Sequence, residues 1–213
     1  PGGVTDANSH PHLDCTKKIA VVHNGIIENY EGLKKDLIKK GHKFLSETDT
    51  EVFPHLIEEL ATTETSADAK AMADKQNSFG EEFKLAFNKI KGLNAIVAIN
   101  IATNEIAAAK TGSPLVVGVG HWPGPEGENE FYISSDPSAV AKHTQKALFL
   151  EDNEMVILGK DLKLFSLPAG SQLSPTLETL EKSVAEEGKG NSQHFMIKEI
   201  YEQPKVLENM AHN

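Results

Sequence analysis

The stretch VVHNGIIENY, residues 21–30, decides which fold the chain is expected to adopt. A β-branched run over residues 18–22 predicts a strand that ends at Asn24 and Gly25. An Asn-Gly pair most often forms the tight turn of a β-hairpin. Here the residues that follow have helical spacing instead, and Asn29 is placed to cap that helix. The pair is therefore predicted to stand between a strand and a helix.

Two interpretations of Asn24 and Gly25 follow from their chemistry. In the structural one, the pair supplies only the backbone freedom that a turn needs. In the functional one, glycine lets the backbone approach a ligand with its N–H exposed, and the asparagine carboxamide adds a second donor. Two such donors can hold a carbonyl oxygen as it becomes an oxyanion. The residue types alone leave both interpretations open.

Asp49 presents a similar choice. Thr48 to Glu51, with the sequence TDTE, match the capping-box pattern ahead of an apolar helical run that starts at Val52. An aspartate at such a position usually caps the helix or interacts with its dipole. Its functional use would be to accept hydrogen bonds from the ammonium group of a substrate.

The order of elements predicts an α+β fold. Helical patterns come first, a block of short strands follows, and helical patterns return at the end of the chain. The expected elements include a strand over residues 42–45, a hairpin over residues 94–110 and a helix over residues 175–186. Strands that follow strands, rather than alternate with helices, favour sheet layers covered by helices. The stretch GHWPGPEGENE, residues 120–130, is predicted to be a loop.

Composition narrows the range of functions. The chain has 213 residues, 39% hydrophobic and 24% charged, which suits one large globular domain. Its net charge is −10, and all 21 cationic residues are lysine, so a nucleic-acid partner is not expected. No apolar stretch is long enough to span a bilayer, and the first residues do not resemble a signal peptide. We therefore expect a soluble, cytoplasmic protein with no membrane partner.

The histidines and the single cysteine give no expectation of a metal or cofactor. Cys15 is the one cysteine, which excludes an internal disulfide and argues against a cysteine-based zinc site. His10, His12 and His23 have a spacing that fits no standard zinc pattern. Cys15 lies in the polar stretch LDCTKK, where an inert thiol is the more common case than a nucleophile.

Five motifs, in this order along the chain, carry a resemblance to a known family. They are NSHPH (residues 8–12), VVHNGIIENY (21–30), SETDTEV (46–52), TGSPLVVG (111–118) and HFMIKEIYEQP (194–204). Together they resemble the class II glutamine amidotransferase domain of the glutamine:fructose-6-phosphate aminotransferases, the isomerizing enzymes that make glucosamine 6-phosphate. The likeness covers nearly the whole chain, and KEIYEQP points to these enzymes within the wider class.

The resemblance implies a fold, a reaction and roles for three residues. The family's fold is the four-layer αββα sandwich of the N-terminal-nucleophile hydrolases. In that family an amino-terminal cysteine attacks the glutamine side-chain amide, ammonia leaves, and water releases glutamate from the thioester. Matched by motif, Asn24 and the Gly25 N–H would form the oxyanion hole, and Asp49 would hold the α-ammonium group of glutamine. Fructose 6-phosphate would bind in separate sugar isomerase domains, and the full-length protein would be a homo-oligomer.

The same resemblance sets the expected domain limits. Residues 1–203 would be the glutaminase domain and residues 204–213 the start of a linker. Pro1 matches a family loop that follows the first strands, the nucleophilic cysteine and an arginine segment that clamps the glutamine carboxylate. We therefore expect a domain incomplete at its N-terminus, inactive as a fragment. The alternatives are another class II amidotransferase, of the amidophosphoribosyltransferase type, and a glutamine-binding module without catalysis.

Overall fold

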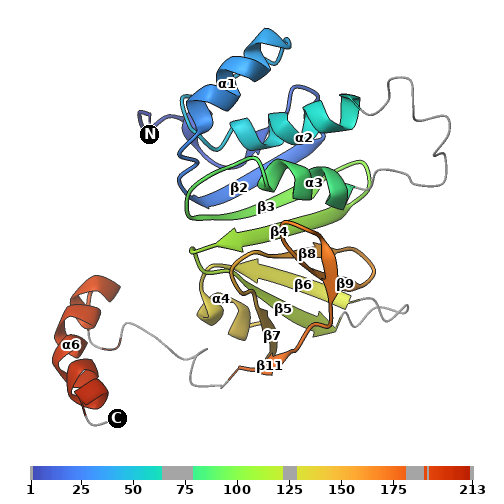
Figure 1. Ribbon diagram of the computed structural model, residues 1–213. Helices are drawn as coiled ribbons and strands as arrows, with labels where there is room; N and C mark the ends of the chain where they lie inside the picture. Colours follow the sequence, from blue (N-terminus) through green and yellow to red (C-terminus); the bar gives the residue numbers. More distant parts are fainter. Residues whose placement is uncertain (1, 64–78, 122–128, 181–189, 191, 212–213) are drawn as a thin grey trace.

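The computed structural model describes residues 2–63, 79–121, 129–180, 190 and 192–211, and these form two antiparallel sheets with helices on either side (Figure 1). The seven-stranded sheet has, in spatial order, β1 (His12–Leu13), β2 (Ile19–Gly25), β3 (Asn94–Asn100), β4 (Glu105–Thr111), β8 (Glu154–Leu158), β9 (Leu162–Ser166) and β10 (Ser171–Leu173). The four-stranded sheet has β11 (Glu178–Thr179), β7 (Lys146–Phe149), β5 (Val116–His121) and β6 (Asn129–Ser134). The helices are η1 (Asp6–Asn8), α1 (Tyr30–Lys39), α2 (Val52–Thr63), α3 (Phe79–Phe87), α4 (Pro137–Ala141) and α6 (Phe195–Ala211).

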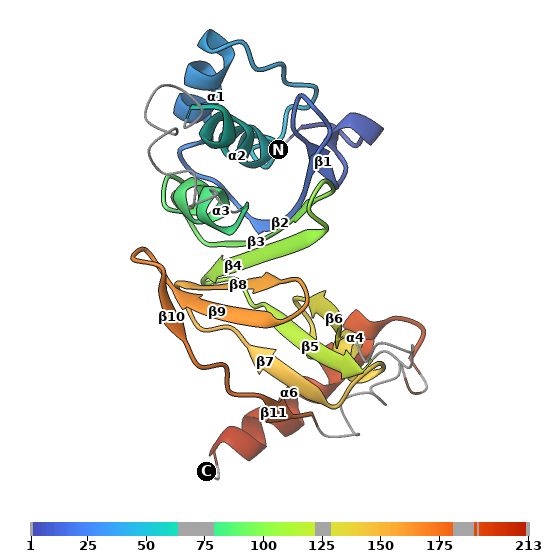
Figure 2. The same ribbon diagram turned by 90° about the vertical axis from the view of Figure 1, so that its right-hand side faces the viewer.

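Three apolar clusters show that the elements stack in the expected αββα order. The first joins α1, α2 and α3 to one face of the seven-stranded sheet. The second fills the space between the two sheets, and the third lies between the four-stranded sheet and α4. Figure 2 shows the same succession, with α1 to α3 on one side of the sheets and α4 on the other. The α+β class and its layers are thus confirmed.

The central strands are apolar on both faces because both faces are covered. In β3, Ile96 belongs to the helix-side cluster, whereas its neighbour Ala95 belongs to the cluster between the sheets. In β4 the alternation is made by Ala107, Ala108 and Ala109, all fully buried. Period-two alternation over a strand buried on both sides gives the continuous apolar run seen in the sequence. Small alanines also leave room for larger side chains from the layers above and below.

The predicted hairpin and helix termini are mostly found. β3 and β4 pair in register through Asn94 to Thr111, with Asn104 in the left-handed region at the turn (φ 55°). Gly41, with φ 100°, ends α1 as expected. Asn29, however, does not cap α1: its carboxamide donates to the Lys89 carbonyl and accepts from the Lys91 N–H. It ties the start of α1 to the segment before β3.

Two predicted elements are wrong. Residues 42–45 form no strand, because the Leu45 N–H donates to the Glu51 carboxylate rather than to a neighbouring strand. Residues 174–180 are not helical: Glu178 and Thr179 pair with β7, and the rest of that predicted helix lies outside the described residues. In both places a tertiary hydrogen bond outweighs a local preference. The predicted loop at residues 120–130 falls mostly outside the described residues as well.

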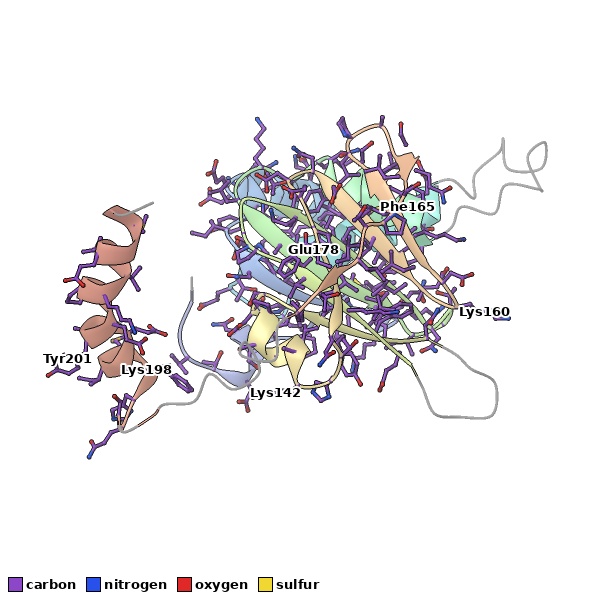
Figure 3. The ribbon with its side chains drawn as sticks, turned by 90° about the horizontal axis from the view of Figure 1, so that it is seen from below. Lys142, Lys160, Phe165, Glu178, Lys198 and Tyr201 are labelled. Carbon is purple, nitrogen blue, oxygen red and sulfur yellow. The ribbon has the colours of Figure 1, made fainter. Side chains whose placement is uncertain are left out.

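The last helix stands apart from the sheets. α6 runs through the predicted domain limit at residue 203 with Pro204 inside it. Figure 3 shows it beside the body of the chain, with Tyr201 on its outer side. Tyr201 is 78% exposed and Met210 71% exposed, so the helix buries little of its apolar surface. Among the helices that the structure describes, none is long and apolar enough to cross a membrane.

Candidate active site

Asn24 and Gly25 are the last two residues of a central strand, not a hairpin turn. β2 pairs antiparallel with β3, which places Asn24 opposite Ala95 and Gly25 opposite Asn94. After Gly25 the chain leaves the sheet toward α1 instead of returning as a neighbouring strand. The pair therefore forms a corner at the edge of the space between the two sheets.

Gly25 is required by the backbone itself. Its φ is +142°, a region that L side chains rarely adopt, and an added Cβ would lie 2.1 Å from the Leu93 carbonyl oxygen. The Ile26 N–H donates to that same carbonyl at 3.4 Å, which holds the two chain segments close together. This constraint exists without any ligand, so glycine at this position is explained by packing as well as by a possible binding role.

A buried histidine fixes the corner from behind. The His23 Nε2 lies 2.8 Å from the Asn94 Oδ1, and its Nδ1 lies 3.0 Å from the Thr50 Oγ1. An Nε2–H tautomer that donates to Asn94 and accepts the Thr50 hydroxyl satisfies both contacts. Burial lowers the pKa of His23 below its ordinary value, and the hydrogen bond with Asn94 opposes this only in part. His23 is thus a neutral link between β2, β3 and the start of α2.

Asp49 lies at the same corner. It is 3% exposed, and its Oδ2 accepts a hydrogen bond from the Ile27 N–H at 2.7 Å. The structure thus brings together Asn24, Gly25 and Asp49, which the sequence separates. The bond to Ile27 has a structural effect of its own, since it holds the chain just after the corner. A carboxylate can accept about four hydrogen bonds, so this contact leaves capacity for a ligand.

The predicted capping box is wrong in its partner. The carboxylate of Glu51 accepts from the N–H groups of Leu45 and Ser46, both at 2.7 Å, and from the Ser46 hydroxyl at 2.6 Å. Burial raises the pKa of Glu51, but the hydrogen bonds from His55, Leu45 and Ser46 outweigh it and lower the pKa to about 2. The loop that carries Asp49 is therefore held by an ionised, buried carboxylate.

A small cavity opens beside Asn24. It has a volume of about 170 Å³ and lies between the sheets, with Asn24 and His10 on one wall and Ser134 and Ser135 on the other. Ligand pockets typically start at roughly 300 Å³, so these residues form part of a pocket, large enough for a side chain. A second cavity of about 280 Å³, next to Gly92 and Pro168, contains none of the three predicted site residues. The chemistry favours the smaller one.

The remaining histidines and Cys15 are placed differently from the expectation. The His12 Nε2 contacts the Thr48 Oγ1 at 3.1 Å, and His10 packs edge-on against His12. Cys15 lies away from the corner, and partial burial with the nearby Glu58 carboxylate raises the pKa of its thiol, which makes it a poor nucleophile. Sequence reasoning missed the Ser134–Ser135 wall and the residues around Cys15. For the latter, the His55 and Glu58 pair at i, i+3 on one helix face was a usable signal.

Comparisons with known proteins agree with this geometry. The family profile described as "Glutamine amidotransferase domain" matches residues 4–141. The glutamine–fructose-6-phosphate aminotransferase [isomerizing] of Methanothermobacter thermautotrophicus is 39% identical over 204 residues, which is 95% of this chain and 31% of that protein. The protein of the same name in Thermococcus kodakarensis is 37% identical over 213 residues, 99% of this chain and 32% of that protein. The chain thus spans about a third of the length of these relatives.

Solved structures agree on the fold. Glutamine phosphoribosylpyrophosphate amidotransferase from B. subtilis aligns with a TM-score of 0.55 and 22% identity, over 77% of this chain and 33% of that one. A structure titled as the allosteric regulatory enzyme of purine biosynthesis aligns with a TM-score of 0.57 and 23% identity, over 77% and 32%. These identities support the N-terminal-nucleophile type of αββα fold and nothing more specific.

The neutral state of His23 generates a pH prediction. Because the pKa of His23 is lower in the folded than in the unfolded chain, the unfolded chain binds more protons below about pH 6.5. The free energy of unfolding is therefore expected to fall as the pH drops through 6.5 toward the folded-state pKa. The slope that one such proton contributes is at most about 1.4 kcal/mol per pH unit.

This contribution is measured by urea unfolding between pH 5 and 8. His23→Gln keeps a donor and an acceptor but cannot titrate, so it is expected to flatten the slope; His143→Gln, at an exposed position, is the matched control. His12 has its pKa lowered in the same direction, so some slope remains. An unchanged slope in His23→Gln would contradict the assignment.

Proposed function

The chain belongs to the glutamine amidotransferase family, and on that premise we propose that it is the glutaminase domain of a glutamine:fructose-6-phosphate aminotransferase. It would hydrolyse glutamine to glutamate and ammonia, and the ammonia would be used to make glucosamine 6-phosphate. Identity of 37–39% to aminotransferases of that name, over nearly the whole chain, supports this acceptor. The observation that carries the proposal is the meeting of Asn24, Gly25 and Asp49 beside one cavity.

Asn24 and Gly25 would stabilise charge on the glutamine side-chain carbonyl. When a thiolate adds to that carbon, the C=O electrons move to the oxygen, which becomes an oxyanion in the tetrahedral intermediate. The Asn24 carboxamide and the Gly25 N–H would donate to this oxygen. The intermediate collapses to a thioester and ammonia, and water then releases glutamate through a second intermediate of the same kind. Preorganised donors act most strongly where charge develops, so one pair serves both steps.

Asp49 would select the amino-acid end of the substrate. Its buried carboxylate is held by the Ile27 N–H on one oxygen, which fixes its orientation before a ligand arrives. An α-ammonium group placed against it would gain a charge-assisted hydrogen bond. Since the carboxylate sits in a site of low exposure, little reorganisation is needed on binding.

The nucleophile is the part of the proposal that this chain supports least directly. Cys15, its one cysteine, lies away from the cavity and has a raised thiol pKa. We therefore assign the nucleophilic cysteine, and the arginine that would clamp the glutamine carboxylate, to residues of the full-length protein outside this 213-residue segment.

The rest of the protein would supply the acceptor chemistry. Residues 1–203 would form the glutaminase domain, and residues 204–213 would lead to sugar isomerase domains that bind fructose 6-phosphate, in a cytoplasmic homo-oligomer. The length of the relatives, about three times that of this chain, supports further domains. The exposed apolar side chains of α6, such as Tyr201 and Met210, would be covered by them.

An amidophosphoribosyltransferase is the second candidate, favoured by the structural alignments. The first test is therefore the choice of acceptor. The full-length protein is expected to form glucosamine 6-phosphate from glutamine and fructose 6-phosphate, with one glutamate per product. Phosphoribosylpyrophosphate in place of the sugar phosphate is the control. Product from the phosphoribosyl acceptor alone would select the second candidate, and absence of glutamate formation would select a binding module.

Asn24→Ala tests the oxyanion assignment. Loss of one donor is expected to lower kcat for glutamine hydrolysis by about 10² to 10³-fold with a small change in KM, because the donor acts in the transition state. Asn88→Ala removes a carboxamide that bonds the Pro168 carbonyl and serves as control. A kcat within about twofold of the parent would contradict the assignment.

Asp49→Asn tests the ammonium contact. Asparagine keeps an acceptor for the Ile27 N–H but loses the charge, so KM for glutamine is expected to rise about 10 to 100-fold, as for a lost hydrogen bond to a charged group. Asp36→Asn, at an exposed position on α1, is the control. An unchanged KM with a lowered melting temperature would assign Asp49 a structural role only.

A further inference from the structure

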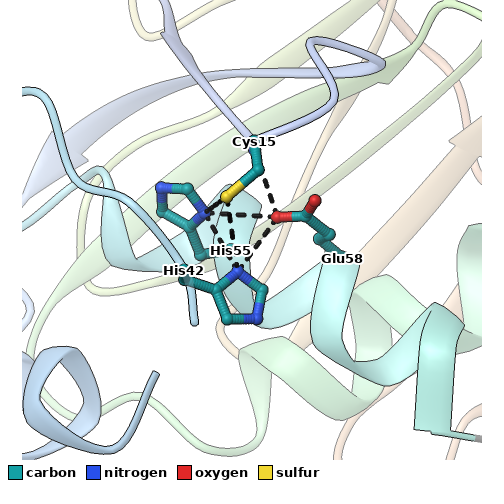
Figure 4. Close-up of side chains that lie close together, drawn as sticks. All are labelled: Cys15, His42, His55 and Glu58. Carbon is teal, nitrogen blue, oxygen red and sulfur yellow. Dashed lines mark hydrogen bonds and ion pairs between the residues drawn. The ribbon is translucent and has the colours of Figure 1, made fainter. Parts of the chain in front are cut away.

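Four side chains from three separate segments converge on the side of α2 that faces the end of α1. Cys15 lies in the segment between β1 and β2, His42 follows the end of α1, and His55 and Glu58 stand one turn apart on α2 (Figure 4). Their ligand atoms all lie within 4.8 Å of one another. None of the four lines the cavity beside Asn24. The cluster is therefore separate from the candidate active site.

The spacing of these atoms fits a tetrahedral metal ion. The two histidine Nδ1 atoms are 3.3 Å apart, and the Glu58 Oε2 lies 3.0 Å from His42 and 3.3 Å from His55. The Cys15 Sγ lies 3.8 Å and 3.6 Å from the same two nitrogens. Zinc bonds of about 2.0–2.1 Å to nitrogen or oxygen and 2.3 Å to sulfur place tetrahedral ligands about 3.3–3.6 Å apart. The observed edges match that figure.

The outward-facing nitrogens of both histidines also match a metal site. The His42 Nε2 lies 3.2 Å from the Glu59 Oε2, and the His55 Nε2 lies 3.7 Å from the Glu51 Oε1. Metal-binding imidazoles characteristically direct their second N–H at a carboxylate, which fixes the tautomer. The His55 Nε2 is fully buried and has no hydrogen-bond partner among the described residues, so the Glu51 charge is its nearest compensation.

That tautomer makes a positive centre necessary. With the protons on both Nε2 atoms, the two Nδ1 lone pairs face each other at 3.3 Å beside a carboxylate oxygen. Such an arrangement is repulsive unless a proton or a cation lies between the groups. A proton can join two of the four atoms, whereas a metal ion satisfies all of them.

We propose that Cys15, His42, His55 and Glu58 bind one zinc ion that holds the β1–β2 segment and the end of α1 to α2. One thiolate, two imidazoles and one carboxylate suit zinc better than magnesium or calcium, which prefer oxygen ligands. The thiolate and carboxylate charges balance the divalent ion, and the thiol proton is released to solvent on binding. With four protein ligands the coordination is closed, so the ion is structural and not catalytic.

The test uses the full-length protein purified without chelators, with metal content measured by mass spectrometry and coordination by X-ray absorption. The expected result is one zinc per chain, with one sulfur and three nitrogen or oxygen neighbours. Replacement by Co²⁺ is expected to give a thiolate-to-metal charge-transfer band with tetrahedral d–d bands. Cys15→Ser should abolish the charge-transfer band, and Glu58→Gln should weaken Co²⁺ binding at least 100-fold, whereas His143→Gln should change neither.

A chelator is expected to lower the Tm of the parent and of His143→Gln, but not that of Cys15→Ser. Absence of zinc and of a Co²⁺ spectrum in the parent would overturn the proposal. So would an equal metal content in Cys15→Ser and Glu58→Gln. If neither variant folds, the parent's X-ray absorption decides, since a shell without sulfur excludes Cys15 as a ligand.

Discussion

The register between β2 and β3 is the constraint on which the rest of the arrangement depends. These strands pair over seven residues in the middle of the larger sheet, and both of their faces are buried between layers. A slip of one residue would exchange the faces, sending His23 into the space between the sheets and Asn24 under the helices. The close approach of Leu93 to Gly25 locks this register, because only glycine fits there. The candidate site thus follows from strand pairing.

Polar groups around the corner are buried only because each has a partner. His23 bonds Thr50 and Asn94, Asp49 bonds the Ile27 N–H, and Glu51 accepts from Ser46. An unpaired group in such a place would cost about 1–3 kcal/mol. The SETDTEV loop therefore acts as one hydrogen-bonded unit. It holds α2 to β2 and keeps the carboxylate of the candidate site in a fixed position.

Much of the fold could be predicted from the sequence, because long periodic segments were informative. The β3–β4 hairpin, the end of α1 at Gly41 and the α+β class came from periodicity and turn chemistry. Residues 42–45 and 175–180 were mispredicted because tertiary bonds, to Glu51 and to β7, decide their conformation. Such contacts are invisible in a local window.

The candidate site was predictable only in part. Asn24, Gly25 and Asp49 came from the motifs, yet their proximity required the fold. The cluster at Cys15 was missed because its four ligands are dispersed over residues 15–58 and match no spacing pattern. Cysteine counting argued against a metal at the one position where the fold supplies three more ligands. Spacing rules fail when a site is assembled from separate segments.

The cavity beside Asn24 has one wall from each sheet, with Asn24 on the larger and Ser134 on the smaller. Any molecule held there bridges two layers that otherwise meet through apolar contacts alone, since the cluster between them is made of hydrophobic side chains. Binding to the folded chain only would add RT ln(1 + [L]/Kd) to its stability. The resistance of this sandwich to unfolding is then a function of ligand concentration, and the cohesion of its two sheets reports how full the site is.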